Sequence, residues 1–191
     1  MTNPDENEFE LWERARQNDG AAFAGLFELH RDRVFARAMV LMENRHDAED
    51  VTAAAFFELW RKRRTVRIVR GSALPWLLVT TVNLARNGRR TMARYDRLLR
   101  TVARSDSADL PDAESIETRQ RLKASLAGLA PLDGALFVLT VLEGLPVSQA
   151  AEAVGLKPAT ARVRLHRVRL RLRAELHDLN PTIRPAEGTF S

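Results

Sequence analysis

The amino-acid sequence predicts an all-α protein made of two small helical domains joined by a flexible linker. Apolar residues recur at spacings of three and four along almost the whole chain, and no convincing stretch alternates with the period of two that a strand requires. A segment rich in serine and aspartate interrupts this pattern, and 191 residues leave room for no more than two domains of ordinary size. The expected boundaries are a first domain over 1–100, a linker over 101–115, a second domain over 116–180 and a disordered tail over 181–191.

Three long helices are expected in the first domain. Apolar spacing places the first over residues 21–42. The second begins near Asp47, whose side chain can cap the free N–H groups of the first turn. The third follows a cap at Ser72 and contains Gly88, which costs about 1 kcal/mol relative to alanine and permits a kink or an early end.

Four helices are expected in the second domain, over residues 116–129, 131–142, 147–154 and 158–179. Gly155 separates the last two, and a helix, a tight turn and a second helix form the outline of a helix-turn-helix. The run RVRLHRVRLRLR in the last helix alternates basic and apolar residues as a strand would. We nevertheless predict a helix, because the run is too long and arginine-rich for an ordinary strand and its leucines also keep spacings of three and four.

The net charge of +5 conceals four blocks of alternating sign. The net charge is −7 over residues 1–60, +12 over 61–104, −5 over 105–156 and +5 over 157–191. Two separated basic blocks indicate two places where the chain grips a polyanion. The alternative is a pair of solvated helix faces.

Composition argues against an enzyme, a metal site or a bound cofactor. The chain has no cysteine, so disulfides and thiolate sites are excluded and a reducing cytoplasm is the natural setting. The acidic start is no signal peptide, and no run is long and apolar enough to span a membrane. There is no glycine-rich phosphate loop. The carboxylates of Asp47, Glu49 and Asp50 are better explained as stabilising a helix N-terminus than as ligands of a metal cation. Four scattered histidines are expected at the surface or on helix flanks: His30, His46, His166 and His177.

The last helix carries the stronger nucleic-acid signal. A helix-turn-helix inserts the N-terminal part of its second helix into the major groove, where arginine and lysine bind guanine or phosphate. The alternative is a plain bundle helix, and its leucines are indeed expected to pack on Leu136, Leu139 and Ala150. The candidate DNA-binding residues are Lys157, Ala159, Thr160, Arg162, Val163, Arg164 and Arg167.

The upstream basic block joins a loop at residues 65–72 to a helix that contains Trp76 and Asn83. Cations around a loop that also offers polar groups can hold an unstacked base of single-stranded nucleic acid. Trp76 is better explained as a core residue. Asn83 is the residue that folding explains least, because it is a mediocre helix former that fills no apolar site.

Three motifs resemble those of a known family. Residues 47–60 fit the pattern D-A-E-D-[LV]-x-x-x-x-F-x-x-x-W, residues 76–77 with 83–85 fit a W-L…N-x-A element, and the third motif lies within residues 144–167. Over most of its length, the chain resembles bacterial RNA polymerase sigma factors of the extracytoplasmic-function group, which keep only two promoter-binding helical domains.

The resemblance implies a transcription initiation factor whose partners are core RNA polymerase and promoter DNA. The helix at 47–60 would dock on the clamp coiled coil of the largest subunit. The second domain would read the minus-thirty-five element through the seven residues named above and contact the flap of the second-largest subunit. The implied core-binding residues are Asp47, Glu49, Asp50, Phe56, Leu59 and Trp60. The implied minus-ten residues, with a loop that captures a flipped base, are Arg67, Arg70, Ser72, Asn83, Arg86, Asn87 and Arg90.

The chain departs from the family pattern at three places. Ala53-Ala54-Ala55 stand where Gln-Glu-Thr is common, which removes polar groups from the expected docking face. Asn87 replaces a common aspartate, and Pro146 replaces the usual serine cap of the short helix.

Two other functions stay open. One is a two-domain helix-turn-helix regulator that binds duplex DNA without polymerase, and the other is an RNA-binding or polymerase-sequestering module. Members of the family are commonly held by an anti-sigma factor between their domains, but the sequence identifies no such partner. We also hypothesise that Asp106, Asp109 and Asp112 of the linker limit indiscriminate binding of nucleic acid by the basic surfaces.

Overall fold

The computed structural model describes residues 4–99 and 113–176, with side chains described for 8–88 and 120–176. The described residues form helices, and their one isolated bridge joins Val69 to Ser72. The elements are α1 (Pro4–Arg16), α2 (Gly20–Leu41), α3 (Arg45–Lys62), α4 (Leu74–Leu99), α5 (Ala113–Ala127), α6 (Pro131–Phe137), the π-helical turn η1 (Val138–Leu142), α7 (Val147–Ala153) and α8 (Pro158–Glu175). This confirms the all-α prediction. Most of the expected linker, with its three aspartates, and the expected tail lie outside the described residues.

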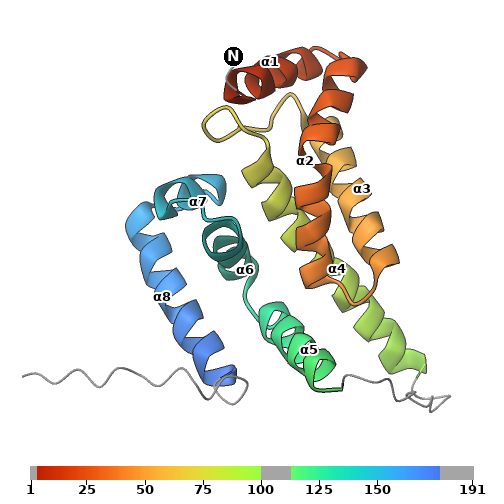
Figure 1. Ribbon diagram of the computed structural model, residues 1–191, viewed down its shortest axis with the longest axis vertical. Helices are drawn as coiled ribbons and strands as arrows, with labels where there is room; N and C mark the ends of the chain where they lie inside the picture. Colours follow the sequence, from red (N-terminus) through yellow and green to blue (C-terminus); the bar gives the residue numbers. More distant parts are fainter. Residues whose placement is uncertain (1–3, 100–112, 177–191) are drawn as a thin grey trace, which may run out of the picture.

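The helices α2, α3 and α4 pack side by side, and α1 lies across one end of them (Figure 1). Their shared core includes Leu26, Val34, Leu59, Leu77 and Leu78, all fully buried. In addition, the ring of Phe56 packs edge-on against two phenylalanines of α2. Asn83 and Asn87 of α4 stay exposed.

The start of α3 differs from the expectation. The N-cap is Asn44 rather than Asp47, because the Asn44 side chain accepts a hydrogen bond from the backbone N of Asp47 at 2.8 Å. The start of α4 agrees with the expected cap at Ser72, because Ser72 Oγ accepts a hydrogen bond of 3.2 Å from the backbone N of Leu74. Gly88 neither ends nor interrupts α4.

The sequence pattern predicts no helix where α1 lies. Its apolar residues nevertheless pack on the first bundle, with Trp12 1% exposed and Ala15 fully buried. The helix α1 approaches α2 at Gly25, where a Cβ added to the glycine would lie 3.2 Å from a methyl carbon of Leu11. The absence of a side chain at Gly25 therefore permits the close approach of α1.

The elements α5 to α8 form a second group. Gly144 and Gly155 both have φ of +70°, as the predicted stop and turn require. The run that alternates basic and apolar residues is helical throughout its described length. The prediction that the leucines of this helix pack on Leu136, Leu139 and Ala150 is wrong for Leu172, which packs with Val168 on Leu126 and Leu129; the α8 residue in the cluster around Leu136 is Ala161.

The two groups pack directly against each other, which the sequence did not predict. The helix α4 contacts α6, η1 and α7, and α2 contacts α5 (Figure 1). A Cβ at Gly134 would lie 3.4 Å from Val82 Cγ1, and Val82 and Leu136 belong to the same buried cluster. Within the part of the chain that the structure describes, no helix is long and apolar enough to cross a membrane.

Candidate nucleic-acid and partner interfaces

The motif helix α3 divides into a buried face and an exposed end. Glu49 and Asp50 are exposed and Asp47 is half-buried, so these carboxylates are accessible at the start of the helix. Phe56 and Leu59 are 3% and 0% exposed. The structure therefore places these two candidate core-binding residues inside the protein, where their contribution to a partner site is to hold α3 in place.

Trp60 is half-buried and lies between an aromatic and a cationic group. Its ring centroid lies 4.9 Å from that of Phe23, and the Arg63 guanidinium lies 4.1 Å from the Trp60 ring centroid. A cation over an indole face is attracted by the ring quadrupole. Trp60 is thus mainly a packing residue that stays partly accessible.

A groove of about 290 Å³ runs between α2 and α3. Half-buried Phe27 and Phe35 and buried Thr52 line its floor, and charged side chains stand at its rim. One rim pair joins Arg45 Nε to Glu49 Oε1 at 2.7 Å. An apolar floor with charges of both signs at the rim suits an amphipathic protein helix.

The three consecutive alanines do not share one surface. Ala53 is exposed and lines the groove, Ala54 is half-buried, and Ala55 is fully buried. Only the first two can alter a docking face. The contribution of α2 to the groove is not evident from sequence, because Phe27 belongs to the stripe that also packs the core.

The loop between α3 and α4 displays two of the candidate minus-ten arginines. Arg67 and Arg70 are exposed, whereas Val66 and Val69 are buried and anchor the loop. Val69 and Ser72 exchange two backbone hydrogen bonds of 3.1 Å. The loop is therefore a short, closed structure with a cationic exterior.

The cations at the end of α3 are less available than their number suggests. Glu58 accepts hydrogen bonds from Arg61 and lies 2.9 Å from Lys62 Nζ. These hydrogen bonds lower the pKa of Glu58 to about 2, so its carboxylate stays ionised at neutral pH. With Arg63 on Trp60, three of the four consecutive cations there are engaged within the protein.

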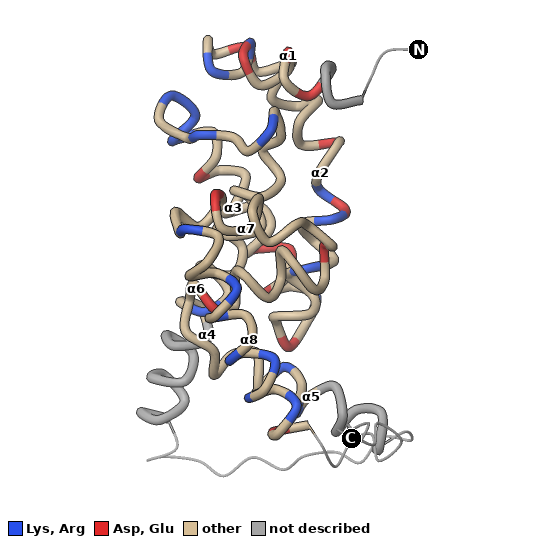
Figure 2. The backbone as a smooth tube through the Cα atoms, turned by 90° about the vertical axis from the view of Figure 1, so that its left-hand side faces the viewer, with Lys and Arg blue, Asp and Glu red and all other residues tan. Residues whose placement is uncertain are grey.

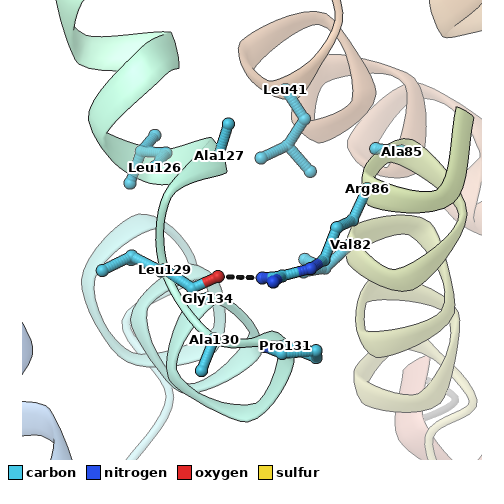
Figure 3. A pocket seen from close by; sticks show the side chains of 10 residues that line it. All are labelled: Leu41, Val82, Ala85, Arg86, Leu126, Ala127, Leu129, Ala130, Pro131 and Gly134. Atoms are coloured by element: carbon cyan, nitrogen blue, oxygen red, sulfur yellow. Dashed lines mark hydrogen bonds between the residues drawn. The ribbon is translucent and has the colours of Figure 1, made fainter. Parts of the chain in front are cut away.

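The α4 candidates lie in three different environments. Asn83 and Asn87 are exposed, in keeping with the expectation that Asn83 fills no core site. Arg86 is half-buried and donates a hydrogen bond to the carbonyl oxygen of Leu129 from the second group, across a small pocket (Figure 3). The side chain of Arg90 lies outside the described ones. Trp76 is half-buried against the core, as expected.

The helix α8 presents most of its candidate residues to solvent, and basic residues recur along it (Figure 2). Arg164 is the exception, because it is half-buried and its Nε donates to Asp133 Oδ1 at 2.7 Å. Ala161 and Leu165 are buried on the face that packs against the rest of the second group, and Arg164 borders that face. The exposed candidates are Lys157, Ala159, Thr160, Arg162, Val163 and Arg167.

The prediction for His30 is wrong. His30 is buried at 4% exposure, and its Nε2 lies 2.7 Å from Oε1 of buried Glu8. Spacing contained a usable signal, because Leu26, His30 and Val34 are four residues apart and both neighbours are core residues. His46 and His166 are exposed as expected, and His177 lies outside the described residues.

Two family models match the chain. The model described as Sigma-70 region 2 matches residues 26–95, and the model described as Sigma-70, region 4 matches residues 119–172. The first covers α3, the loop and most of α4, and the second covers the predicted helix-turn-helix.

Curated relatives match over both segments. The ECF RNA polymerase sigma factor SigE of Mycolicibacterium smegmatis is 35% identical over 164 residues, which are 81% of this chain and 63% of the relative. The RNA polymerase sigma factor CarQ of Myxococcus xanthus is 31% identical over 172 residues, which are 87% of this chain and 96% of the relative. The chain thus spans 63% of the length of one relative and nearly all of the other.

Two solved structures share the fold. CnrH, in complex with the cytosolic domain of CnrY, aligns over 90% of this chain and 98% of its own, with a TM-score of 0.62 and 22% identity. The sigma factor RpoE of Bartonella quintana, in complex with the anti-sigma factor NepR, aligns over 81% of this chain and 96% of its own, with a TM-score of 0.55 and 23% identity.

Proposed function

This chain belongs to the extracytoplasmic-function group of RNA polymerase sigma factors, the subunits that direct RNA polymerase in transcription initiation, and we propose that three of its surfaces share that work. Sigma factors are normally not enzymes, and each proposed step is a binding step. Residues 1–100 form the domain for core polymerase and the minus-ten element, and residues 116–180 form the domain for the minus-thirty-five element. The proposed location of the protein is the cytoplasm, where promoter DNA lies.

The groove between α2 and α3 is the proposed site for core polymerase, and it is the observation that carries the proposal. A regulator that only binds DNA has no need of an apolar groove with a charged rim beside α3. A helix of the clamp coiled coil would lay its apolar side on Phe27 and Phe35 and meet the rim charges Arg45 and Glu49. The flap of the second-largest subunit would contact the second domain.

The loop and the exposed side of α4 form the proposed minus-ten surface. Arg67 and Arg70 would hold phosphates, and Asn83 would contact an unstacked base near the loop. Capture of the extruded base would offset the few kcal/mol that its unstacking costs, so promoter opening would follow from binding alone.

The first turns of α8 form the proposed minus-thirty-five reader. Their exposed lysine, threonine and arginines are residue types that contact base edges and phosphates in the major groove. Arg164 is held at its Nε by Asp133, which leaves its terminal nitrogens to meet a base.

An anti-sigma factor is a further proposed partner. The sigma factor RpoE in one of the two related structures is bound to an anti-sigma factor, and CnrH in the other is bound to the cytosolic domain of CnrY. A protein that occupied the α2–α3 groove of this chain would compete with core polymerase. Co-purification of a protein from the native host, followed by competition against core polymerase, tests this proposal.

The deciding experiment combines the protein with core polymerase and a library of promoters and maps transcript starts. Specific starts that require this chain support the proposal. Specific duplex binding without any polymerase-dependent start would favour a helix-turn-helix regulator that acts without polymerase. RNA binding, or inhibition of another sigma factor, would favour an RNA-binding or polymerase-sequestering module.

A matched pair of variants tests the groove itself. Ala53→Glu places a charge in the groove and should lower affinity for core polymerase at least tenfold, because a buried charge at an apolar contact is unfavourable. Ala21→Glu makes the same change at an exposed position in the first turn of α2, away from the residues that line the groove, and should leave that affinity unchanged. Equal affinity of both variants for core polymerase would place the docking site elsewhere.

A further inference from the structure

A buried polar cluster lies where α1, α2 and the start of α4 meet. Glu8 and His30 are 5% and 4% exposed. Oε1 of Glu8 lies 2.7 Å from His30 Nε2 and also accepts a hydrogen bond of 2.7 Å from the backbone N of Ala73. The Ser72 side chain is a further hydrogen-bond partner of the same carboxyl group. One carboxylate thus joins three elements that are far apart in the sequence.

The carboxyl group is held in its charged form. Burial raises the pKa of Glu8, but the hydrogen bond and charge of His30, with the hydrogen bonds from Ala73 and Ser72, outweigh burial and lower the pKa below its ordinary value. The backbone N of Ala73 is one of the free donors at the beginning of α4, where negative charge is favoured. The carboxylate therefore fixes the point at which the loop becomes a helix.

The loop tip depends on that fixed point. Between Val69 and Ser72 the chain makes a tight turn in which Arg70 and Gly71 have φ of +52° and +80°. Two consecutive positive φ values are typical of a type I′ turn, a conformation that costs a non-glycine residue energy. A turn of this kind keeps one geometry only where its ends are held.

The helix α1 also contacts the turn from outside. The nearest atom to a Cβ built on Gly71 is Phe9 Cβ, at 3.8 Å, and Phe9 is 49% exposed. Glu8 and Phe9 are adjacent in α1, so one turn of that helix is bonded to the end of the loop and lies close to its tip. The N-terminal helix is therefore part of the structure that shapes the loop.

We propose that Glu8 and His30 are positioning residues for the minus-ten loop, holding Ser72 and Ala73 so that the Arg70–Gly71 tip is ordered before DNA arrives. The inference rests on the proposed role of the loop in base capture and assigns a function to a helix that lies outside both matched family segments. A loop that is ordered in advance loses less conformational entropy on binding, which increases its affinity.

The test separates positioning from stability. Replacing both partners of a buried polar pair by apolar residues of similar volume can leave stability nearly unchanged, so the double variant Glu8→Leu/His30→Leu removes the bond to Ala73 while keeping the packing. Glu8→Gln keeps an oxygen acceptor and serves as the conservative variant. Leu11→Ala in the same helix loses packing over Gly25 without touching the loop, and it serves as the stability control.

Each holoenzyme is tested on a promoter that the wild type transcribes. We expect the double variant to bind the single non-template strand of the minus-ten element about tenfold more weakly, the effect of one hydrogen bond to a charged group, with duplex minus-thirty-five binding unchanged. Glu8→Gln should bind the single strand nearly as well as wild type. Equal losses for the double variant and for Leu11→Ala, or no loss in the double variant, would overturn the proposal.

Amide hydrogen exchange of the free protein distinguishes this inference from the base-capture role. The double variant should exchange the Ala73 amide at least tenfold faster than wild type, while exchange in the middle of α3 is unchanged. If the double variant exchanged the Ala73 amide faster but the wild-type holoenzyme did not bind the single strand, base capture would be rejected. The role of Glu8 and His30 in ordering the loop would still stand. Unchanged exchange at Ala73 would reject the positioning role itself.

Discussion

At the scale of single residues, Arg164 differs from the other arginines at the start of α8 because an acidic side chain orients it. Arg164→Ala should weaken binding to the preferred minus-thirty-five duplex by about 1–3 kcal/mol and relax the preference at one base pair. Arg167→Ala, which removes an exposed cation, should weaken binding to all sequences alike and lower the salt slope by about one unit. Titrations over a set of mutated sites at several salt concentrations measure both effects. A uniform loss for Arg164→Ala would show that it contacts only phosphate.

A second residue-scale prediction concerns Glu8 and acid. Because the folded-state pKa of Glu8 is lowered, its charge stabilises the fold above the ordinary carboxyl value of 4.5, and this contribution is lost as the pH falls through the folded-state pKa. Wild type should therefore be more stable than Glu8→Gln at pH 6, and the difference should shrink below about pH 4.5. Urea unfolding of both proteins from pH 6 to pH 3 measures it. A difference that grew towards low pH would contradict the assigned ionisation.

At the scale of elements, the cap of α3 is a separable contributor to stability. Asn44→Ala removes the acceptor for the Asp47 amide and should cost about 1 kcal/mol of unfolding free energy. Asn44→Ser keeps a capping oxygen and should cost only a few tenths of that amount. Urea unfolding curves give the comparison directly. Because Asp47 and Glu49 follow this cap, loss of the first turn should also weaken core polymerase binding.

Helices and turns were predictable from sequence where the apolar spacing or the turn residue lies within the element itself. The stripe through Leu26 and Val34 and the turn at Gly155 follow from spacing and backbone freedom alone, and the structure has both. The helix α1 carries only a short stripe within a largely acidic segment, in which Leu11, Trp12 and Ala15 keep spacings of three and four, and it packs closely on α2 at Gly25. Phe56 belongs to the motif that indicated a partner, yet it is buried, because a motif does not distinguish residues that bind from residues that hold the binding helix.

At the scale of the whole molecule, one buried carboxylate adds a polar link to the apolar contact between the two groups. The Glu143 side chain is 1% exposed and accepts hydrogen bonds from Arg33, at 2.6 Å, and from Arg37. Arg37 also donates to the carbonyl oxygen of Leu142 at 2.9 Å. These partners lie between 105 and 110 positions apart in the sequence, so no local pattern could have revealed them.

This contact has a consequence for promoter binding. The minus-ten and minus-thirty-five positions are about 25 base pairs apart, or about 85 Å of straight duplex at 3.4 Å per step. The helix α4, with 26 residues, is about 39 Å long. Because α6 packs directly on α4 and Arg86 is bound to Leu129, the two groups that carry the proposed readers are packed together. We therefore expect the two groups to separate when the protein binds both elements at once.

Glu143→Ala should favour that separation. It leaves Arg33, which is 56% exposed, and Arg37 without their shared acceptor, and it removes hydrogen bonds to a charged group, worth about 1.5 kcal/mol each. We expect a larger radius of gyration by small-angle scattering, with helix content unchanged. Glu152→Ala, which removes an exposed carboxylate from α7 of the same group, should scatter like wild type. If Glu143→Ala kept the radius of wild type, the apolar contact between Val82 and Gly134 would suffice to hold the groups together, and promoter binding would have to break that contact instead.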